Sequence, residues 1–341
     1  MSMAPTPTAP ARPLTDGYGR RISYLRISVT DRCDLRCRYC MSEKMQFLPR
    51  RDILSFEEID MIASAFVARG VRRIRLSGGE PLVRKGVVDL AHRLGRHLES
   101  GDLDELTMTS NATRLARHAE ALVDAGIGRI NVSLDTRDPE TFRYITRWGE
   151  LEKTLEGIAA AKAAGLEVKI NMVALKGLND DQIVPMMRWC ASEGHGLTLI
   201  ETMPLGRIDD DRHDRYLPLD AVQRDLEEQF QLVPLAERTG GPARYWKVEE
   251  LGLKLGLITP LTNNFCDGCN RVRITVSGQI YMCLGHDDHL DLKTALRKGG
   301  TEALDRVLDR AMTLKPKQHD FSISGDSDTP SVARHMSVTG G

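Results

Sequence analysis

Short apolar or alternating segments recur along the first two thirds of the chain, separated by longer segments with helical spacing. Six short segments predict strands, at residues 24–30, 72–78, 105–111, 129–135, 167–175 and 197–203. The segments between them predict helices at 56–70, 87–98, 114–126, 151–165 and 182–194. Six βα units in series indicate an α/β fold, with a parallel sheet covered by helices and curled into a partial barrel. Six units fall short of the eight that close a full barrel, so we expect one side to be open.

This rhythm breaks after Gly206. A polar loop at 206–215 precedes a helical pattern at 219–230, hairpin-like strands at 240–260, a further apparent hairpin, and helical patterns at 291–298 and 301–312. We therefore expect a disordered N-terminal tail (1–15), a partial barrel (16–206), a C-terminal α+β domain (207–319) and a flexible tail (320–341).

Composition narrows the class of protein. The chain has 341 residues, 41% of them hydrophobic and 28% charged, which is typical of a soluble protein with a sizeable core. A formal net charge of −1 gives no global field for nucleic acid or an anionic membrane, so any anionic ligand needs local basic residues. No apolar segment is long enough for a signal or a membrane span, which predicts a cytoplasmic protein with reduced thiols.

The seven cysteines fit a disulfide framework poorly, and six of them fall into two groups. Cys33, Cys37 and Cys40 lie in the loop after the first strand, on the face where parallel barrels build their sites. Three buried apolar cysteines or a zinc site are the alternatives. Charged residues alternate with these cysteines, and no fourth zinc ligand lies nearby. Three thiolates around a four-iron cluster would instead leave one iron open to a small molecule.

The second group is Cys266, Cys269 and Cys283. His286 and His289 are near enough in sequence to complete a zinc site, which stays an alternative to a second cluster with an open iron. Arg271 and Arg273 follow Cys269 and would share one face of a strand. Because guanidinium groups suit phosphate oxygens, the pair predicts an anion pocket beside the second group, against the alternative of a solvated strand face.

Several motifs together carry a family resemblance. TDRCDLRCRYCM contains the CxxxCxxC spacing of radical S-adenosylmethionine (SAM) enzymes, and RLSGGEPLVR follows the second strand. FCDGCNRVR, Cys283 and a terminal Gly-Gly narrow the match. From about Asp16 to Gly341 the chain resembles the MoaA-type GTP 3′,8-cyclases. The resemblance implies a partial (β/α)6 radical SAM barrel with a C-terminal extension, two [4Fe-4S] clusters and SAM.

The resemblance also implies a reaction and partners. Reductive cleavage of SAM gives methionine and a 5′-deoxyadenosyl radical, which takes the ribose 3′ hydrogen of GTP. The 3′ carbon then attacks C8 of guanine, giving 3′,8-cyclo-7,8-dihydro-GTP in the first step of molybdenum cofactor synthesis. A cyclic pyranopterin monophosphate synthase would take the product, flavodoxin or ferredoxin would donate electrons, and the protein would be a homodimer.

Site residues follow from the same resemblance. The SAM contacts fall on Tyr39, Gly78, Gly79, Glu80, Ser133 and Met203. The GTP contacts fall on Arg26, Arg75, Thr109, Lys169, Arg271, Val272 and Arg273. Arg271 and Arg273, with the terminal Gly340 and Gly341, are expected to support catalysis.

Other interpretations stay open. Arg26, Arg75 and Lys169 could each be a salt-bridged core residue, and Cys190 matches no ligand position and is expected to be a buried helix cysteine. The sequence departs from the family pattern at Ala112, in place of a turn glycine, at Thr198, in place of an arginine, and at Arg73, in place of a lysine. A radical SAM enzyme acting on a peptide and a zinc-stabilised binding protein are the alternative functions.

Overall fold

Six parallel strands form the centre of a curled sheet, as the sequence predicts. The computed structural model describes residues 12–206, 208, 212–237, 240–323 and 330–340. Each central strand lies within one predicted segment or begins a residue before it: β1 Tyr24–Ser28, β2 Arg73–Ser77, β3 Glu105–Ser110, β4 Arg129–Ser133, β5 Glu167–Ala174 and β6 Gly196–Glu201. Neighbouring strands pair in parallel in sequence order, which confirms the succession of βα units.

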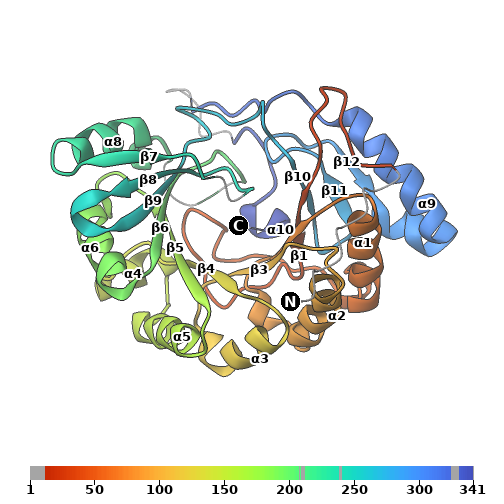
Figure 1. Ribbon diagram of the computed structural model, residues 1–341, viewed down its shortest axis with the longest axis horizontal. Helices are drawn as coiled ribbons and strands as arrows, with labels where there is room; N and C mark the ends of the chain where they lie inside the picture. Colours follow the sequence, from red (N-terminus) through yellow and green to blue (C-terminus); the bar gives the residue numbers. More distant parts are fainter. Residues whose placement is uncertain (1–11, 207, 209–211, 238–239, 324–329, 341) are drawn as a thin grey trace, which may run out of the picture.

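The C-terminal region extends this sheet at both edges. The other strands are β7 Leu232–Leu235, β8 Arg244–Val248, β9 Leu253–Ile258, β10 Arg271–Ile274, β11 Gln279–Tyr281 and β12 His289–Asp291. β10 pairs in parallel with β1 and β9 with β6, and antiparallel partners continue outward on each side. The result is one sheet of 12 strands in the order β12-β11-β10-β1-β2-β3-β4-β5-β6-β9-β8-β7, bent into an open arc (Figure 1).

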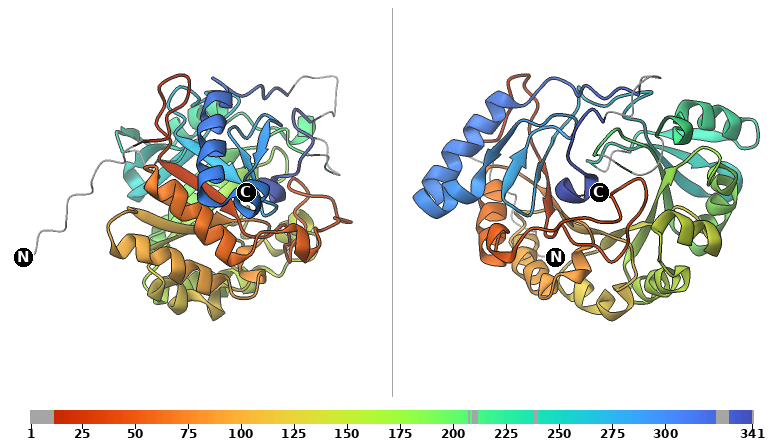
Figure 2. Two further views of the ribbon diagram at one scale, coloured as in Figure 1. Left: turned by 90° about the vertical axis from the view of Figure 1, so that its right-hand side faces the viewer. Right: turned by 180° about the vertical axis from the view of Figure 1, so that it is seen from behind.

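Most helices cover the outside of the arc (Figures 1 and 2), whereas α10 (Met336–Thr339) lies inside its curve against β1. The bounds of the helices are α1 Phe56–Ala68, α2 Val87–Glu99, α3 Ala119–Asp124, α4 Pro139–Thr146, α5 Leu151–Ala163, α6 Ile183–Glu193, α7 Arg212–Arg215, α8 Leu219–Glu227, α9 Leu292–Leu314 and α10 Met336–Thr339. α9 joins the two predicted C-terminal helical patterns across a bend at Gly300, where φ is 59°. Cys190 on α6 is fully buried, as expected.

Packing against the barrel begins before the predicted boundary at residue 16. Leu14 is fully buried, its N–H donates to the Arg69 carbonyl, and its carbonyl accepts from the Ile22 N–H. Residues 1–11 of the predicted tail lie outside the described residues. The buried Leu14 side chain thus packs into the core two residues before Asp16, where the barrel was expected to begin.

The last described residues return to the middle of the arc. Leu205 and Val332 form a parallel bridge, and α10 lies against β1, so the chain ends inside the curve of the sheet (Figure 1). Residues 324–329 and Gly341 of the predicted tail lie outside the described residues. In the part of the chain that the structure describes, no helix combines the length and apolar character needed to cross a membrane.

Candidate active site

The first cysteine loop is held from outside by the end of α4. The backbone N–H groups of Arg36 and Arg38 donate to the carbonyls of Thr146 and Ile145 at 3.2 and 2.9 Å. Within the loop, the N–H of Cys40 donates to the Cys37 carbonyl at 2.9 Å. These bonds satisfy backbone groups that have no sheet or helix partner, and they fix the three thiols over the carboxyl end of β1.

Two glycines of the Ser77–Pro81 segment allow this loop to pack against the next one. A Cβ at Gly78 would lie 2.3 Å from the Thr30 carbonyl oxygen, and one at Gly79 would lie 2.3 Å from the Arg32 carbonyl oxygen. The N–H groups of Gly79 and Glu80 donate to the same two carbonyls at 2.8 Å. The sequence suggested close approach to a ligand; in the structure the glycines approach the cysteine loop itself.

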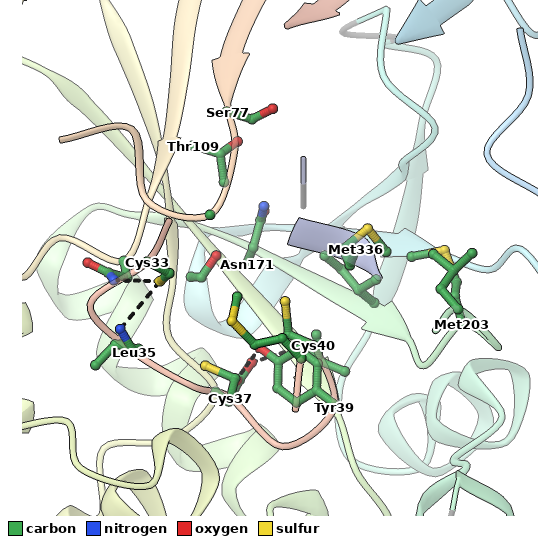
Figure 3. Close-up of a pocket in the computed structure, with 18 of the residues that line it drawn as sticks. Cys33, Leu35, Cys37, Tyr39, Cys40, Ser77, Thr109, Asn171, Met203 and Met336 are labelled. Carbon is green, nitrogen blue, oxygen red and sulfur yellow. Dashed lines mark hydrogen bonds between the residues drawn. The ribbon is translucent and has the colours of Figure 1, made fainter. Parts of the chain in front are cut away.

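A pocket opens above the three cysteines (Figure 3). Five of the six predicted SAM contacts line it: Tyr39, Gly78, Gly79, Ser133 and Met203. Thr109, expected to contact GTP, lines this pocket rather than the second one. Burial raises the pKa of the Cys40 thiol to about 12, and that of Cys37 also rises, so a bound metal would be needed to hold these cysteines as thiolates.

Glu80 lies behind the pocket rather than in it. Its buried carboxylate accepts from the Leu82 and Asn111 N–H groups at 3.0 and 2.6 Å, and from the Ser110 hydroxyl at 2.9 Å. Burial raises the pKa of Glu80 to about 7, against these hydrogen bonds, which lower it. The carboxylate therefore joins the loops after β2 and β3 and positions the pocket wall.

Charged side chains on the concave face form a row across neighbouring strands. The register places Arg26 beside Arg273 of β10 on one side and beside Arg75 of β2 on the other. Among the described residues none of the three has a carboxylate within ion-pair distance: Arg75 donates to the Thr107 hydroxyl, and Arg26 and Arg273 donate to the Gly340 carbonyl. Burial and the neighbouring arginines lower the pKa of Arg26 to about 10. Within the described chain, Arg26 and Arg75 thus form no salt bridge, contrary to the alternative interpretation of the sequence.

Lys169 of β5 extends this positive face. Its ammonium group donates to the Tyr245 hydroxyl and, among the described residues, has no carboxylate partner within ion-pair distance. The pKa of Lys169 is lowered to about 7, mainly by burial and next by repulsion from Arg129, Arg75 and Lys254. Like charges side by side without counter-charges destabilise a sheet, so this surface is complementary to an anion.

A second pocket is lined by the arginine row, by Lys169 and by the second cysteine group. Its lining includes Arg26, Arg75, Lys169, Arg271, Val272 and Arg273 together with Cys266, Cys269 and Cys283. Asn171, Ile200, Met203 and Met336 line both pockets, so the two adjoin. The Nε atom of Arg271 and the hydroxyl of Thr198 are buried without a hydrogen-bond partner in the described chain, which leaves polar atoms available to a ligand.

The second cysteine group is enclosed by the segment after α9. Arg20 donates to the carbonyls of Cys266, Pro316 and Lys317 at 2.6 to 2.7 Å and so ties the cysteine loop to this segment. Lys315 donates to the sulfur of Cys269 at 3.4 Å. Burial alone would raise the pKa of Cys269, but Lys315 and Arg271 outweigh it, and the pKa is lowered.

The two histidines considered as zinc ligands face elsewhere. The ring of His286 contacts the Gln318 carbonyl, the ring of His289 contacts the Asp287 carbonyl, and neither lines the second pocket. In the described ranges no three Cys, His, Asp or Glu side chains stand close enough to share one metal ion. Two sets of three thiols, each set lining a pocket, suit a larger group such as an iron–sulfur cluster.

Two family models cover most of the chain. "Radical SAM superfamily" matches residues 27–190 and "Molybdenum Cofactor Synthesis C" matches residues 195–321. A GTP 3′,8-cyclase of Bradyrhizobium diazoefficiens is 60% identical over 96% of both chains. The GTP 3′,8-cyclase of Agrobacterium fabrum is 55% identical over 100% of this chain and 98% of its own. The chain belongs to the GTP 3′,8-cyclase family of radical SAM enzymes.

The same fold recurs in solved structures that are distant in sequence from this cyclase family member. Streptococcus suis SuiB bound to S-adenosylmethionine has a TM-score of 0.61 at 15% identity, covering 84% of this chain and 66% of its own. An anSMEcpe structure with bound AdoMet has a TM-score of 0.50 at 17% identity, covering 61% and 57%. These likenesses confirm the radical SAM fold alone.

Some residues of this cyclase site were not predicted. Asp135 accepts from the Tyr39 hydroxyl at 2.7 Å and from the Val173 N–H at 2.8 Å, so it sets the position of a predicted SAM contact. It directly follows Ser133-Leu134, and a carboxylate at the end of a barrel strand was an available signal. Arg20 and Lys315 had no such signal, because their contacts with the second cysteine group join segments far apart in sequence.

Proposed function

We propose that this chain is a GTP 3′,8-cyclase that converts GTP to 3′,8-cyclo-7,8-dihydro-GTP, the first step of molybdenum cofactor synthesis. The observation that carries the proposal is the row of Arg273, Arg26 and Arg75 without carboxylate partners in the described chain. The row lies in a pocket that also holds three cysteines and adjoins a second three-cysteine pocket. A zinc-stabilised binding protein has no use for this arrangement.

In the first pocket Cys33, Cys37 and Cys40 would hold a [4Fe-4S] cluster, and Tyr39, Gly78, Gly79, Ser133 and Met203 would contact SAM. When bound, these groups supply the one-electron chemistry that removes a hydrogen from the substrate ribose. Tyr39 is fixed by its hydrogen bond to Asp135, so its ring is preorganised before the cofactor arrives. Glu80 supports the same wall from behind.

In the second pocket Cys266, Cys269 and Cys283 would hold a second [4Fe-4S] cluster, and GTP would bind in the same pocket. Arg26, Arg75, Lys169 and Arg273 would bind the triphosphate, and Arg271 would orient the nucleotide between the two groups. A triphosphate supplies the negative charge that this surface lacks, and each charge-assisted hydrogen bond contributes roughly 1.5–3 kcal/mol.

The C-terminal residues would complete the substrate pocket. The Gly340 carbonyl accepts from Arg273 at 2.7 Å and from Arg26 at 3.3 Å, and Met336 stands where the two pockets meet. Gly340 would therefore orient two phosphate-binding arginines and, with Met336, help to keep water away from the reacting carbon. Gly341, which the family resemblance also assigns to catalysis, lies outside the described residues.

The test is anaerobic reconstitution with iron and sulfide, followed by reductant, SAM and GTP. The proposal expects about eight irons per chain and 5′-deoxyadenosine whose formation depends on GTP, together with a cyclised nucleotide. A Cys283→Ala variant should lose about half of the iron but still form 5′-deoxyadenosine from SAM. Zinc in place of iron, or 5′-deoxyadenosine formation indifferent to GTP, would refute the cyclase assignment.

A second test addresses the arginine row. Arg273→Ala removes one charge-assisted phosphate contact and should weaken GTP binding by about ten- to a hundredfold. Arg72→Ala is the matched control, because Arg72 pairs with Asp104 outside the pocket. Equal GTP affinity in the two variants would contradict the phosphate role of the row.

The remaining partners follow from the family membership. We propose flavodoxin or ferredoxin as the electron donor, a homodimeric assembly, a cytoplasmic site of action, and a pyranopterin monophosphate synthase as the enzyme that consumes the product. An acid-labile cyclic nucleotide that accumulates without that synthase would support the last point.

A further inference from the structure

Lys315 is a buried cation without a buried carboxylate. It caps the end of α9, and 3% of the residue is exposed. Its ammonium group donates to the Met282 carbonyl at 2.6 Å, the Arg271 carbonyl at 3.0 Å and the sulfur of Cys269 at 3.4 Å. An ammonium group has three donors, so all of them are used.

The counter-charge of Lys315 must come from the cysteine side. Among the described residues its ammonium group has no Asp or Glu as a partner, and two of its three acceptors are neutral carbonyls. Burying an unpaired charge is costly, so a protein keeps one only where an opposite charge is present in the functional state. Cys269 is the one acceptor that can carry a negative charge.

The hydrogen bonds of Lys315 also join the two strands that lie between Cys269 and Cys283. Cys269 precedes β10 and Cys283 follows β11, and Lys315 joins Arg271 of β10 to Met282 at the end of β11. Arg20 holds the next two residues, Pro316 and Lys317, against the Cys266 loop. The ammonium group therefore cannot swing to solvent without breaking the packing that brings the three cysteines together.

We propose that Lys315 is the positioning residue and fixed counter-charge of the second cysteine group, and that it raises the reduction potential of the cluster held there. The inference rests on the proposed function, which assigns that cluster to Cys266, Cys269 and Cys283. Reduction adds one electron and no proton to the cluster, so the reduced form carries one more negative charge. A nearby cation stabilises that form, and its removal shifts the potential to a more negative value.

The experiment isolates the second cluster. Cys33, Cys37 and Cys40 are replaced by Ala in the full chain, which leaves only the second set of ligands, and the iron content and the potential are measured by titration with dithionite. Lys315→Met should give the same iron content and a more negative potential. Lys317→Met is the matched control, because Lys317 is exposed on the same segment and should leave the potential unchanged.

The outcomes separate the two proposals. If the parent variant holds no iron, the second cluster of the proposed function fails, whatever Lys315 does. If the parent holds iron and Lys315→Met leaves the potential unchanged, the inference is wrong. If the Lys315→Met variant folds but binds no iron, the Lys315→Arg and Lys315→Gln variants are compared. Iron binding restored by Arg alone supports the role of Lys315 as a counter-charge. Iron binding restored by Gln contradicts that role and shows that Lys315 acts only as a hydrogen-bond donor.

Discussion

Lys169 carries its charge where a charge is costly, and this has a measurable consequence. Burial and three nearby cations lower its pKa to about 7, far below the usual range for lysine. A bound triphosphate reverses the balance by adding negative charge, which raises the pKa again. GTP binding above pH 7 should therefore take up a proton, and GTP affinity should fall as pH rises, by up to about tenfold per pH unit.

Calorimetry of GTP binding at pH 8, in two buffers with different ionisation enthalpies, measures this proton uptake. Lys169→Met should abolish the buffer dependence. Lys254→Met is an informative partner variant, because it removes one repelling cation from Lys169 and should reduce the uptake. Identical binding heats in both buffers for the unsubstituted protein would show that Lys169 is already charged.

At the residue scale, sequence patterns could predict which residues form the site but not how each is held. Cysteine spacing identifies the two cysteine groups that line the pockets because it is local, and the RxR pattern places Arg271 and Arg273 on one face because strands alternate. The row of Arg273, Arg26 and Arg75 depends instead on register between strands up to about 250 residues apart. The contacts of Lys315 depend on two carbonyls that the pairing of β10 with β11 brings together.

The central elements could be predicted because their patterns are local and repeated. α4 could not be separated from the adjoining loop by periodicity, although Asp138 before Pro139 is a helix-start signal and its carboxylate caps the Thr141 N–H at 2.8 Å. The pairing of β9 with β6 and of β10 with β1, at opposite sides of the six central strands, was not predictable, since the pattern of a strand does not specify its partner.

Contact between α5 and the turn after β3 gives a prediction at the element scale. Ala112 has φ of 64°, a left-handed conformation at the position where the family pattern has glycine. Its carbonyl oxygen lies against α5, where a Cβ at Gly157 would come within 2.1 Å of it. Gly157→Ala should therefore destabilise the protein by about 1–3 kcal/mol, although alanine is the better helix former.

Urea unfolding measures this difference in the free energy of unfolding. Gly128→Ala is the matched control, because no atom lies within 4 Å of a Cβ at that position and its backbone is not left-handed. Its effect should stay within about 0.5 kcal/mol. If the Gly157→Ala variant is as stable as the control, α5 can move away from the turn without loss of packing.

On the scale of the whole molecule, the C-terminal region completes the site that the barrel begins. Strands added at both edges bring the second cysteine group beside β1, and the last residues return to the inside of the arc (Figure 1). The two pockets thus adjoin through four residues from β5, β6 and α10 or the chain beside them. A site built from distant segments of the chain is complete only when every segment is packed in its place.

Seating of the C-terminal segment should depend on Gly340. Its φ is 80°, and a Cβ there would lie 2.0 Å from the Ser77 hydroxyl oxygen and 3.0 Å from the Ser77 Cβ. Gly340→Ala should displace the segment, remove the carbonyl that orients Arg273 and Arg26, and lower cyclase activity while both iron sites stay loaded. Trypsin cleavage after Arg334 measures whether the C-terminal segment stays packed, since that side chain is held by Asp287 and by the Leu284 carbonyl. In the Gly340→Ala variant we expect cleavage about tenfold faster than in the unsubstituted protein, which corresponds to a loss of about 1.4 kcal/mol in the free energy of packing the segment. Gly17→Ala, with open space around its Cβ, should leave both the cleavage rate and the activity unchanged. Normal resistance to trypsin together with lost activity would move the role of Gly340 from seating the segment to direct contact with the nucleotide.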